Sequence, residues 1–174
     1  MDGFHLSRAQ LSAMPDPDTA HARRGAAFTF DASSFHSLMQ SLRQPLTSSS
    51  KTIHAPSFSH ATKDPVADDI PIPPTCRIVV TEGNYIALDE GEWKKARDCM
   101  DEVWFVEVEE RVARGRLVKR HIAAGLASNE EEAGKRADEN DLVNGREIAE
   151  KRGRVNEVVY SREDDGWKPD GRAS

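Results

Sequence analysis

Two carboxylates in the sequence are placed to do chemistry. Glu82 follows the β-branched run of residues 77–81 and opens the polar turn Glu82-Gly83-Asn84. Asp2 lies in the cluster Asp-Gly-Phe-His near the N-terminus. In open α/β sheets, ligands bind outside the carboxyl ends of the strands, where a carboxylate can hold a metal ion or accept a proton from a hydroxyl. A satisfied polar turn is the alternative interpretation of Glu82.

A basic face is predicted on one helix. Arg116, Lys119 and Arg120 are spaced i, i+3 and i+4, so a helix over residues 109–124 places them on one side. In a chain of formal net charge −6, a concentrated basic face favours a phosphate ligand. A solvated helix face is the alternative interpretation.

The next predicted helix, over residues 128–151, carries a polar stripe that could face the same ligand. Arg136, Asn140 and Asn144 recur there every four residues. Gly125 separates this helix from the basic one, so the two are expected to run antiparallel. Such a helix pair suits a lid that closes over a bound ligand.

These residues need a scaffold, and the sequence pattern predicts an α/β fold. Helices are expected over residues 18–25, 32–43, 92–97, 109–124 and 128–151, and strands over residues 77–81, 103–108 and 158–160. Strands that alternate with helices are typical of a parallel sheet. The run of residues 77–81 predicts a strand that is buried on both faces. Residues 44–74, rich in proline, serine and aspartate, are expected to be irregular.

Local signals mark the ends of these helices. Asp31 is expected to cap the helix over residues 32–43. Ser128 and Glu131 have the spacing of a capping box for the last helix. Within the basic helix, Glu110 and Arg114 form an i,i+4 pair of opposite charge that should stabilise it.

Length and composition limit the class of protein. The 174 residues predict one domain with at most a tail. With 24 basic and 30 acidic residues, the chain does not match a nucleic-acid binder that works by global attraction. No apolar stretch is long enough for a membrane span, and no secretory signal is visible. Cys76 and Cys99 are expected to be core thiols in a reducing, cytoplasmic environment.

Several motifs of nucleotide-binding proteins and hydrolases are absent from the sequence. No segment matches the phosphate loop G-x-x-x-x-G-K-[ST] or the dinucleotide fingerprint G-x-G-x-x-G. No G-x-S-x-G occurs either, so an α/β-hydrolase triad has no nucleophile.

Six short motifs occur in a definite order along the chain. They are MDGFHL (residues 1–6), HARRGAAFTFD (21–31), APSFSH (55–60), KDPV (63–66), VTEGNY (80–85) and NDLVNG (140–145). Together they resemble the phosphoribulokinase/uridine kinase-like P-loop kinases. The most similar branch is the fructose-transport-kinase-like and fungal ATPase-like group, with pantothenate kinase as a more distant relative. The resemblance extends to about residue 160.

The resemblance implies a P-loop NTPase-like parallel sheet flanked by helices. It implies a kinase domain over residues 1–160 with a helical lid over about residues 109–151, and then a polar tail over residues 161–174. In that family a strand, the phosphate loop and a helix precede the Asp-Gly-Phe motif, and this strand is central in the sheet. The chain is therefore expected to be a truncated kinase domain that lacks this strand and helix and is inactive by itself.

The resemblance also implies roles for single residues. Asp2 matches the carboxylate that acts as base toward the acceptor hydroxyl or helps to position Mg²⁺, and Glu82 matches an acidic residue near the metal. Arg116 and Arg120 resemble lid residues that reach the transferred phosphoryl group. The expected substrate-binding residues are His5, Arg23, Arg24, His60, Tyr85, Asn140 and Asn144.

The leading hypothesis is an ATP-dependent kinase that phosphorylates a hydroxyl of a sugar, a nucleoside or a pantothenate-like metabolite. ATP and Mg²⁺ are then the expected cofactors, the partner is a small-molecule acceptor, and homo-oligomer formation is left open. The alternative is a catalytically inactive remnant that binds a metabolite or a protein. A nucleic-acid-binding module is disfavoured because the chain is acidic and few aromatic residues lie among the basic ones. No membrane partner is expected.

Overall fold

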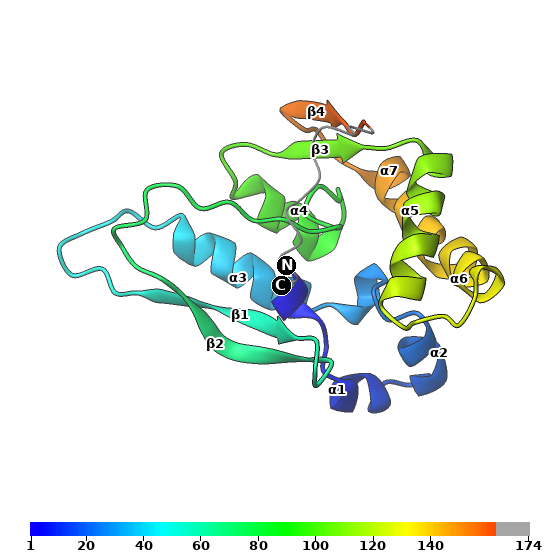
Figure 1. The fold of residues 1–174 in the computed structure, drawn as a ribbon. Helices are drawn as coiled ribbons and strands as arrows, with labels where there is room; N and C mark the ends of the chain where they lie inside the picture. The colour runs from blue at the N-terminus through cyan, green and yellow to red at the C-terminus, as the bar shows by residue number, and fades with distance from the viewer. Residues whose placement is uncertain (163–174) are drawn as a thin grey trace.

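The computed structural model describes residues 1–162, in which helices pack between and beside two small sheets (Figure 1). The α-helices are α1 (Arg8–Ser12), α2 (Pro17–Ala22), α3 (Ala32–Leu42), α4 (Gly91–Asp98), α5 (Glu110–Ala123), α6 (Glu130–Arg136) and α7 (Leu142–Lys151). Two 3₁₀ turns, η1 (Asp2–Phe4) and η2 (Ala27–Thr29), and a π-helical turn, η3 (Ala137–Asp141), complete the helical set. The strands are β1 (Ile53–Ser59), β2 (Asp64–Ile72), β3 (Trp104–Glu107) and β4 (Glu157–Tyr160).

The predicted α/β class is confirmed by the sheet of β3 and β4. These strands run parallel, with Trp104 opposite Glu157 and Glu107 opposite Tyr160. The connection between them passes through α5, α6, η3 and α7, which lie beside the sheet in Figure 1. A parallel pair needs a crossover of this kind, because a tight turn can only join antiparallel strands.

The predicted strand over residues 77–81 is wrong for this structure. These residues belong to no strand, and the side chains of Ile78 and Val80 are 84% and 87% exposed. β3 is also largely exposed, since Trp104 and Val106 are each 63% exposed. A β-branched run becomes a strand only where a neighbouring backbone pairs with it, and within residues 1–162 no segment does so.

The region predicted to be irregular contains a β-hairpin. β1 and β2 pair antiparallel from Ile53 opposite Ile72 to Ser59 opposite Asp64, with an irregularity in register at Pro56. Proline usually argues against a strand because it cannot donate to the ladder. Both strands of an isolated hairpin are edges, however, so the prolines disrupt no second pairing.

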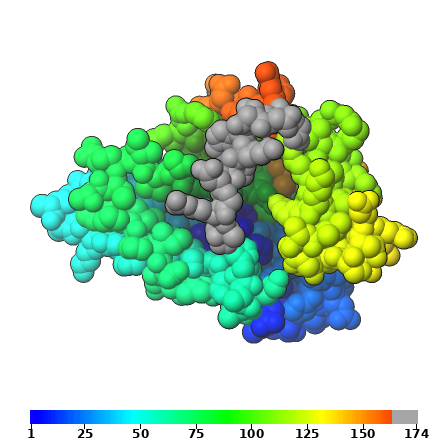
Figure 2. All heavy atoms as spheres, viewed as in Figure 1, coloured from blue at the N-terminus to red at the C-terminus, as the bar shows by residue number. Residues whose placement is uncertain are grey.

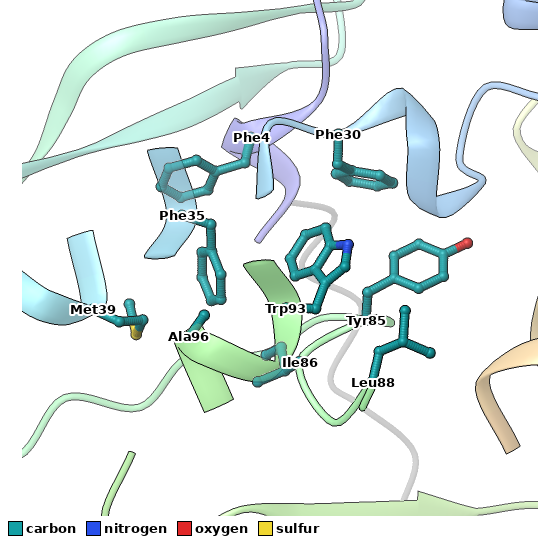
Figure 3. Close-up of a cluster of buried hydrophobic side chains, with 9 residues drawn as sticks. All are labelled: Phe4, Phe30, Phe35, Met39, Tyr85, Ile86, Leu88, Trp93 and Ala96. Carbon is teal, nitrogen blue, oxygen red and sulfur yellow. The ribbon is translucent and has the colours of Figure 1, made fainter. Parts of the chain in front are cut away.

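An aromatic cluster joins the N-terminal segment to the middle of the chain (Figure 3). The rings of Phe35 and Trp93, from α3 and α4, lie 5.6 Å apart between centroids. Phe30 contacts both Tyr85 and Trp93 edge-on. The full set of buried members is Phe4, Phe30, Phe35, Met39, Tyr85, Ile86, Leu88, Trp93 and Ala96. This cluster holds η1, and with it Asp2, against the polar turn at Glu82.

The cap predicted for α3 is confirmed. The Asp31 carboxylate accepts hydrogen bonds from the Ser34 backbone N–H (2.9 Å) and the Ser34 hydroxyl (2.7 Å). The capping box predicted at Ser128 is not formed. Asn129 caps α6 by accepting from the Glu132 N–H, while Ser128 donates to the Glu132 carboxylate.

Asp31→Ala is expected to lower the free energy of unfolding by about 1 kcal/mol, because it leaves helix N–H groups without an acceptor. Ser33→Ala, on the same helix, is the matched control and should change stability by no more than about 0.5 kcal/mol. Urea denaturation of the two variants measures the difference. Equal midpoints would show that Asp31 does not stabilise α3.

The ion pair predicted within the basic helix is not formed. Arg114 instead donates two hydrogen bonds to Asp138 in η3, at 2.7 and 2.8 Å. Glu110 accepts two from Arg146 in α7, at 3.0 and 2.7 Å. The Arg114 guanidinium therefore holds the pKa of Asp138 below its usual range, and Arg146 does the same for Glu110. Both pairs tie α5 to the helices that follow it.

Two further expectations concern the surface. Cys76 is exposed, so the prediction of a core thiol is wrong for it, whereas Cys99 is half-buried and packs against the aromatic cluster. No helix within residues 1–162 is long and apolar enough to cross a membrane. The predicted polar tail lies, from residue 163 onward, outside the described residues.

Candidate active site

The structure brings Met1, the neighbour of Asp2, into contact with Glu82. The Met1 ammonium donates to the Glu82 backbone carbonyl at 2.5 Å and lies 3.9 Å from Glu82 Oε1. Asp2 is the next residue and is exposed, as is the Glu82 side chain. The N-terminal segment and the turn after residues 77–81 therefore meet through direct contacts.

Gly3 allows η1 to approach the hairpin. A Cβ at this position would lie 2.1 Å from the Pro56 carbonyl oxygen, which no side chain can accommodate. The middle residue of the Asp-Gly-Phe motif is thus required by a close backbone contact. That contact positions Asp2 and His5 relative to β1.

His5 lies in an aromatic sandwich beside Asp2. Its ring centroid is 4.0 Å from that of Phe30 and 5.0 Å from that of Phe58 on β1. Its Nδ1 is 2.8 Å from the Asp2 carbonyl oxygen. His60, at the tip of the hairpin, is exposed and contacts Phe58. Two of the predicted substrate-binding residues, His5 and His60, thus both contact the Phe58 ring.

Arg24 extends the same cluster. Its Nη2 donates to the Leu6 carbonyl at 3.0 Å and lies 3.5 Å from Asp64, and its guanidinium lies over the Phe58 ring at 5.6 Å. Its Nε is buried and has no partner among the described residues. The Arg24 guanidinium is therefore held between the Leu6 carbonyl, Asp64 and the Phe58 ring.

Sequence reasoning missed Asp64 and Arg8, which support Arg24. The Asp64 carboxylate accepts from the Arg8 backbone N–H at 2.8 Å and lies between the two arginines. The Arg8 N–H, more than either charge, holds the pKa of Asp64 below its usual range. The motif KDPV (residues 63–66) contains Asp64, so the sequence pointed to this segment but not to the role of its carboxylate.

We expect His5 to make stability depend on pH. Burial lowers the pKa of His5, so below about pH 6.5 the unfolded chain binds a proton that the folded chain resists. The free energy of unfolding then falls as pH is lowered through that window. His5→Gln should flatten this dependence in denaturation curves recorded at about pH 7 and 5.5. His60→Gln, at an exposed histidine, is the control, and equal pH slopes in all three proteins would contradict the prediction.

Arg23 links the N-terminal segment to η3 and α7. Its Nε donates to Asn140 at 3.0 Å and its Nη2 donates to Asn144 at 2.9 Å. Two members of the predicted polar stripe, Asn140 and Asn144, therefore face Arg23. Each amide still has its NH₂ group for a ligand, so the predicted substrate contacts of these three residues stay predictions.

Tyr85 lies in the core. It is fully buried, and its hydroxyl donates to the Gly25 carbonyl at 2.7 Å. Burial, with the nearby Glu147 charge, raises the pKa of Tyr85 to about 12, so the hydroxyl keeps its proton. This hydrogen bond positions the segment Arg23-Arg24-Gly25, and with it the two arginines of the candidate site.

The basic face predicted on α5 is exposed. Arg116, Lys119 and Arg120 all lie at the surface, and Arg116 Nη1 donates to the Ser161 hydroxyl at 2.8 Å. Ser161 follows β4, and its N–H donates to the carbonyl of Glu107 at the end of β3. Arg116 therefore lies at the carboxyl ends of the parallel strands, where ligands bind in α/β sheets.

Comparison with known proteins identifies the family. No family model matches the chain. The chain is 50% identical over 159 residues to the ATP-dependent kinase-like protein notR' of Aspergillus versicolor, covering 91% of this chain and 92% of that protein. It is 44% identical to a candidate uridine kinase, C227.14, of Schizosaccharomyces pombe, covering 83% of this chain and 60% of that protein.

The chain belongs to the uridine kinase-like P-loop kinase family. Two crystal structures agree with this assignment. YFH7 of Saccharomyces cerevisiae, described as a P-loop kinase candidate with a circular permutation, superposes with a TM-score of 0.80 at 34% identity, covering 94% of this chain. A candidate fructose transport system kinase from Silicibacter sp. TM1040 gives 0.79 at 32% identity, covering 91% of this chain and 71% of that one.

The relatives differ in length. The chain spans 57% of the YFH7 structure and 60% of the S. pombe protein, but 92% of the A. versicolor kinase-like protein. Family membership and the kinase-like P-loop fold therefore rest on nearly the whole chain, whereas several family members carry much more polypeptide.

The site can be tested for fit to the Mg²⁺ that a P-loop kinase uses. Asp2 and Glu82 supply oxygen ligands, which Mg²⁺ prefers, and this ion commonly keeps several waters. Within residues 1–162, no group of three or more His, Cys, Asp or Glu side chains is placed to hold a metal. An ion held by Asp2 and Glu82 would have to take its remaining ligands from water and phosphate oxygens.

Proposed function

We propose that this chain provides the acceptor site, the carboxylates and the lid of an ATP-dependent kinase that phosphorylates a hydroxyl of a small metabolite. The observation that carries the proposal is the direct contact between the Asp2 segment and Glu82, next to the cluster of His5 and Arg24. This contact unites two motifs that are eighty residues apart in the sequence.

The residues divide the chemistry among them. Asp2 accepts the proton of the acceptor hydroxyl or helps to position Mg²⁺, and Glu82 holds Mg²⁺ through water. Bound Mg-ATP supplies the phosphoryl group. Arg116 and Arg120 stabilise the negative charge that develops during transfer, which is the main task of a protein in this reaction. His5, Arg24 and His60 bind the acceptor.

ATP binding depends on a part of the family fold that residues 1–174 do not contain. A phosphate loop supplies several backbone N–H donors and a lysine, and no such motif occurs in the sequence. The experiment therefore compares residues 1–174 with the completed chain. We use that name for residues 1–174 preceded by the strand, phosphate loop and helix of a uridine kinase.

We expect the completed chain to bind Mg-ATP at least about tenfold more tightly than residues 1–174, a difference of about 1.4 kcal/mol or more. Isothermal titration calorimetry measures both dissociation constants. A low-micromolar constant for residues 1–174 would contradict the expectation and would place the phosphate site within them.

The proposed reaction is tested by transfer from radiolabelled ATP. The acceptors are a panel of nucleosides, hexoses and pantothenate, each with the completed chain and Mg²⁺. Transfer to one acceptor class, absent without Mg²⁺, supports the proposal and names the substrate. Folded, ATP-binding protein that transfers to no member of the panel would contradict it.

The second candidate function is a non-catalytic binding protein. It is favoured by the absence of a phosphate loop from the sequence. Under this hypothesis the cluster of His5 and Arg24 still binds a metabolite. Saturable binding of an acceptor to residues 1–174, together with no transfer by the completed chain, would support it over the kinase.

A further inference from the structure

A buried polar contact joins α5 to η3. His121 of α5 is 3% exposed, and its Nε2 lies 3.3 Å from Asp141 Oδ2 in η3. Within residues 1–162, neither His121 Nδ1 nor Asp141 Oδ2 has a hydrogen-bond partner, so the 3.3 Å approach is not aligned as a hydrogen bond. Buried polar atoms in native proteins almost always have partners, and an exception points to strain or to function.

Stability does not account for this contact. Leaving a buried polar atom without a partner costs about 1–3 kcal/mol, and replacing a buried ion pair by apolar side chains of similar size is often neutral or stabilising. Arg114 and Asp138 already tie α5 to η3 through two hydrogen bonds. A costly contact beside them is expected to persist where it keeps a neighbouring group in a required position.

The side of α5 that meets η3 lies opposite its basic face. Arg114 and His121 are about two helical turns apart, so they share the side of α5 that contacts η3. Arg116, Lys119 and Arg120 lie roughly opposite. Because His121 directly follows Arg120, fixing His121 against η3 also fixes the turn of α5 that carries Arg120.

The same part of the chain holds the contacts of Arg23. Asn140, which precedes Asp141, accepts from Arg23 Nε at 3.0 Å, and Asn144 accepts from Nη2 at 2.9 Å. η3 is a π-helical turn, a conformation that is rare and that often occurs at functional sites. In Figure 2 the yellow-green and yellow atoms of α5 and α6 lie directly above the blue atoms of α1 and α2, which Arg23 follows. The contacts of His121 and Arg23 thus fall on consecutive residues of one turn.

We propose that His121 is a positioning residue that acts through Asp141. It fixes the turn of η3 from which Asn140 meets Arg23, so that the basic face of α5 and the arginine segment of the acceptor site keep one relative position. This assignment rests on the proposed function, which gives the basic face and the acceptor site their roles. The coupling between His121 and Arg23 is a physical property that can be measured without catalysis.

Two other ion pairs join α5 to the later helices, Arg114 with Asp138 and Arg146 with Glu110. All four side chains are about half exposed, so water and salt screen these pairs and each contributes little to stability. The contact of His121 with η3 is buried and is screened much less. The positioning of η3 is therefore assigned to the buried contact.

The test compares His121→Gln with His121→Met in residues 1–174. The two new side chains have nearly the same length. The Gln amide can donate to Asp141 from about the position of Nε2, whereas Met fills the same space without a donor. Native-state hydrogen exchange is measured in both variants and in the unsubstituted chain, with the amides of α3 as the internal reference.

We expect the amides of residues 137–141 and of residues 23–26 to exchange at least about fivefold faster in His121→Met than in His121→Gln. The N–H groups of residues 23–26 are all hydrogen-bonded, so their exchange reports on the segment that contains Arg23. His121→Gln should exchange like the unsubstituted chain. The amides of α3 should exchange equally in all three proteins.

Arg23→Met provides the reciprocal test, because a coupling free energy is the same in both directions. The substitution removes the bonds to Asn140 and Asn144. We expect exchange of residues 119–123 in α5 to become faster, although Arg23 does not belong to that helix. Adding Arg23→Met to His121→Met should change exchange little further, because both substitutions break the same connection.

Two outcomes would overturn the proposal. Equal exchange of residues 23–26 in His121→Gln and His121→Met would show that the contact with Asp141 does not position the Arg23 segment. Faster exchange of α3 by the same factor would assign the effect to a loss of global stability and make His121 a structural residue. Exchange is measured without ATP or acceptor, so a completed chain that transfers no phosphoryl group would contradict the proposed function and leave this result standing.

Discussion

Arg120→Ala is expected to lower phosphoryl transfer by the completed chain about a thousandfold, because an arginine that stabilises the transferred phosphoryl group is worth at least that much in turnover. The side chain of Arg120 is exposed on α5, one helical turn from Arg116. Removing it takes away charge stabilisation of the transition state and leaves the packing of the helix intact.

The melting temperature separates this role from a structural one. An exposed substitution of this kind usually changes stability by no more than about 0.5 kcal/mol. Arg111→Ala is the matched control, since Arg111 is exposed near the start of α5 and points away from the basic face. An unchanged rate in Arg120→Ala together with a lowered melting temperature would remove Arg120 from the lid and make it a structural residue.

Asp2→Asn should lower the turnover of the completed chain by about 100- to 10,000-fold, which is the usual contribution of a general base. The substitution keeps the size of the side chain and removes its ability to take a proton. Because a base acts in the transition state, the affinity for Mg-ATP should change much less than the turnover.

The comparison of turnover with ATP affinity decides the role of Asp2. Asp18→Asn, at an exposed position on α2, is the control for loss of one negative charge. Equal losses in turnover and ATP affinity would indicate that Asp2 binds Mg²⁺ and does not act as the base. No loss in either quantity would remove Asp2 from the site.

The sequence predicted which residues belong to the candidate site better than it predicted the contacts that they make. The motifs named Asp2, Glu82, His5 and Arg24, and the structure places these four residues around η1. Their order along the chain carried that information. Asp64 was missed because its partners come from α1 and from the segment before Gly25, and sequence spacing does not report such pairs.

The prediction of an ion pair within α5 failed because both residues also have a partner of opposite charge on a later helix. Glu110 and Arg114 are one turn apart on α5, yet each binds a residue of a later helix. A pair within one exposed helix is worth only about 0.3–0.5 kcal/mol, so a bidentate contact with another element prevails. The sequence pattern could not show that η3 and α7 bring Asp138 and Arg146 within reach.

The sequence by itself determined the local features and the family: the cap at Asp31, the break at Gly125 and the ordered motifs depend on neighbours in the chain. Only the tertiary structure decided which extended segments are strands. The proline-containing segments of the hairpin pair with each other, whereas residues 77–81, the most β-prone run in the chain, find no partner within residues 1–162. The physical reason is that a helix satisfies its own backbone, while a strand is stable only when another strand lies beside it.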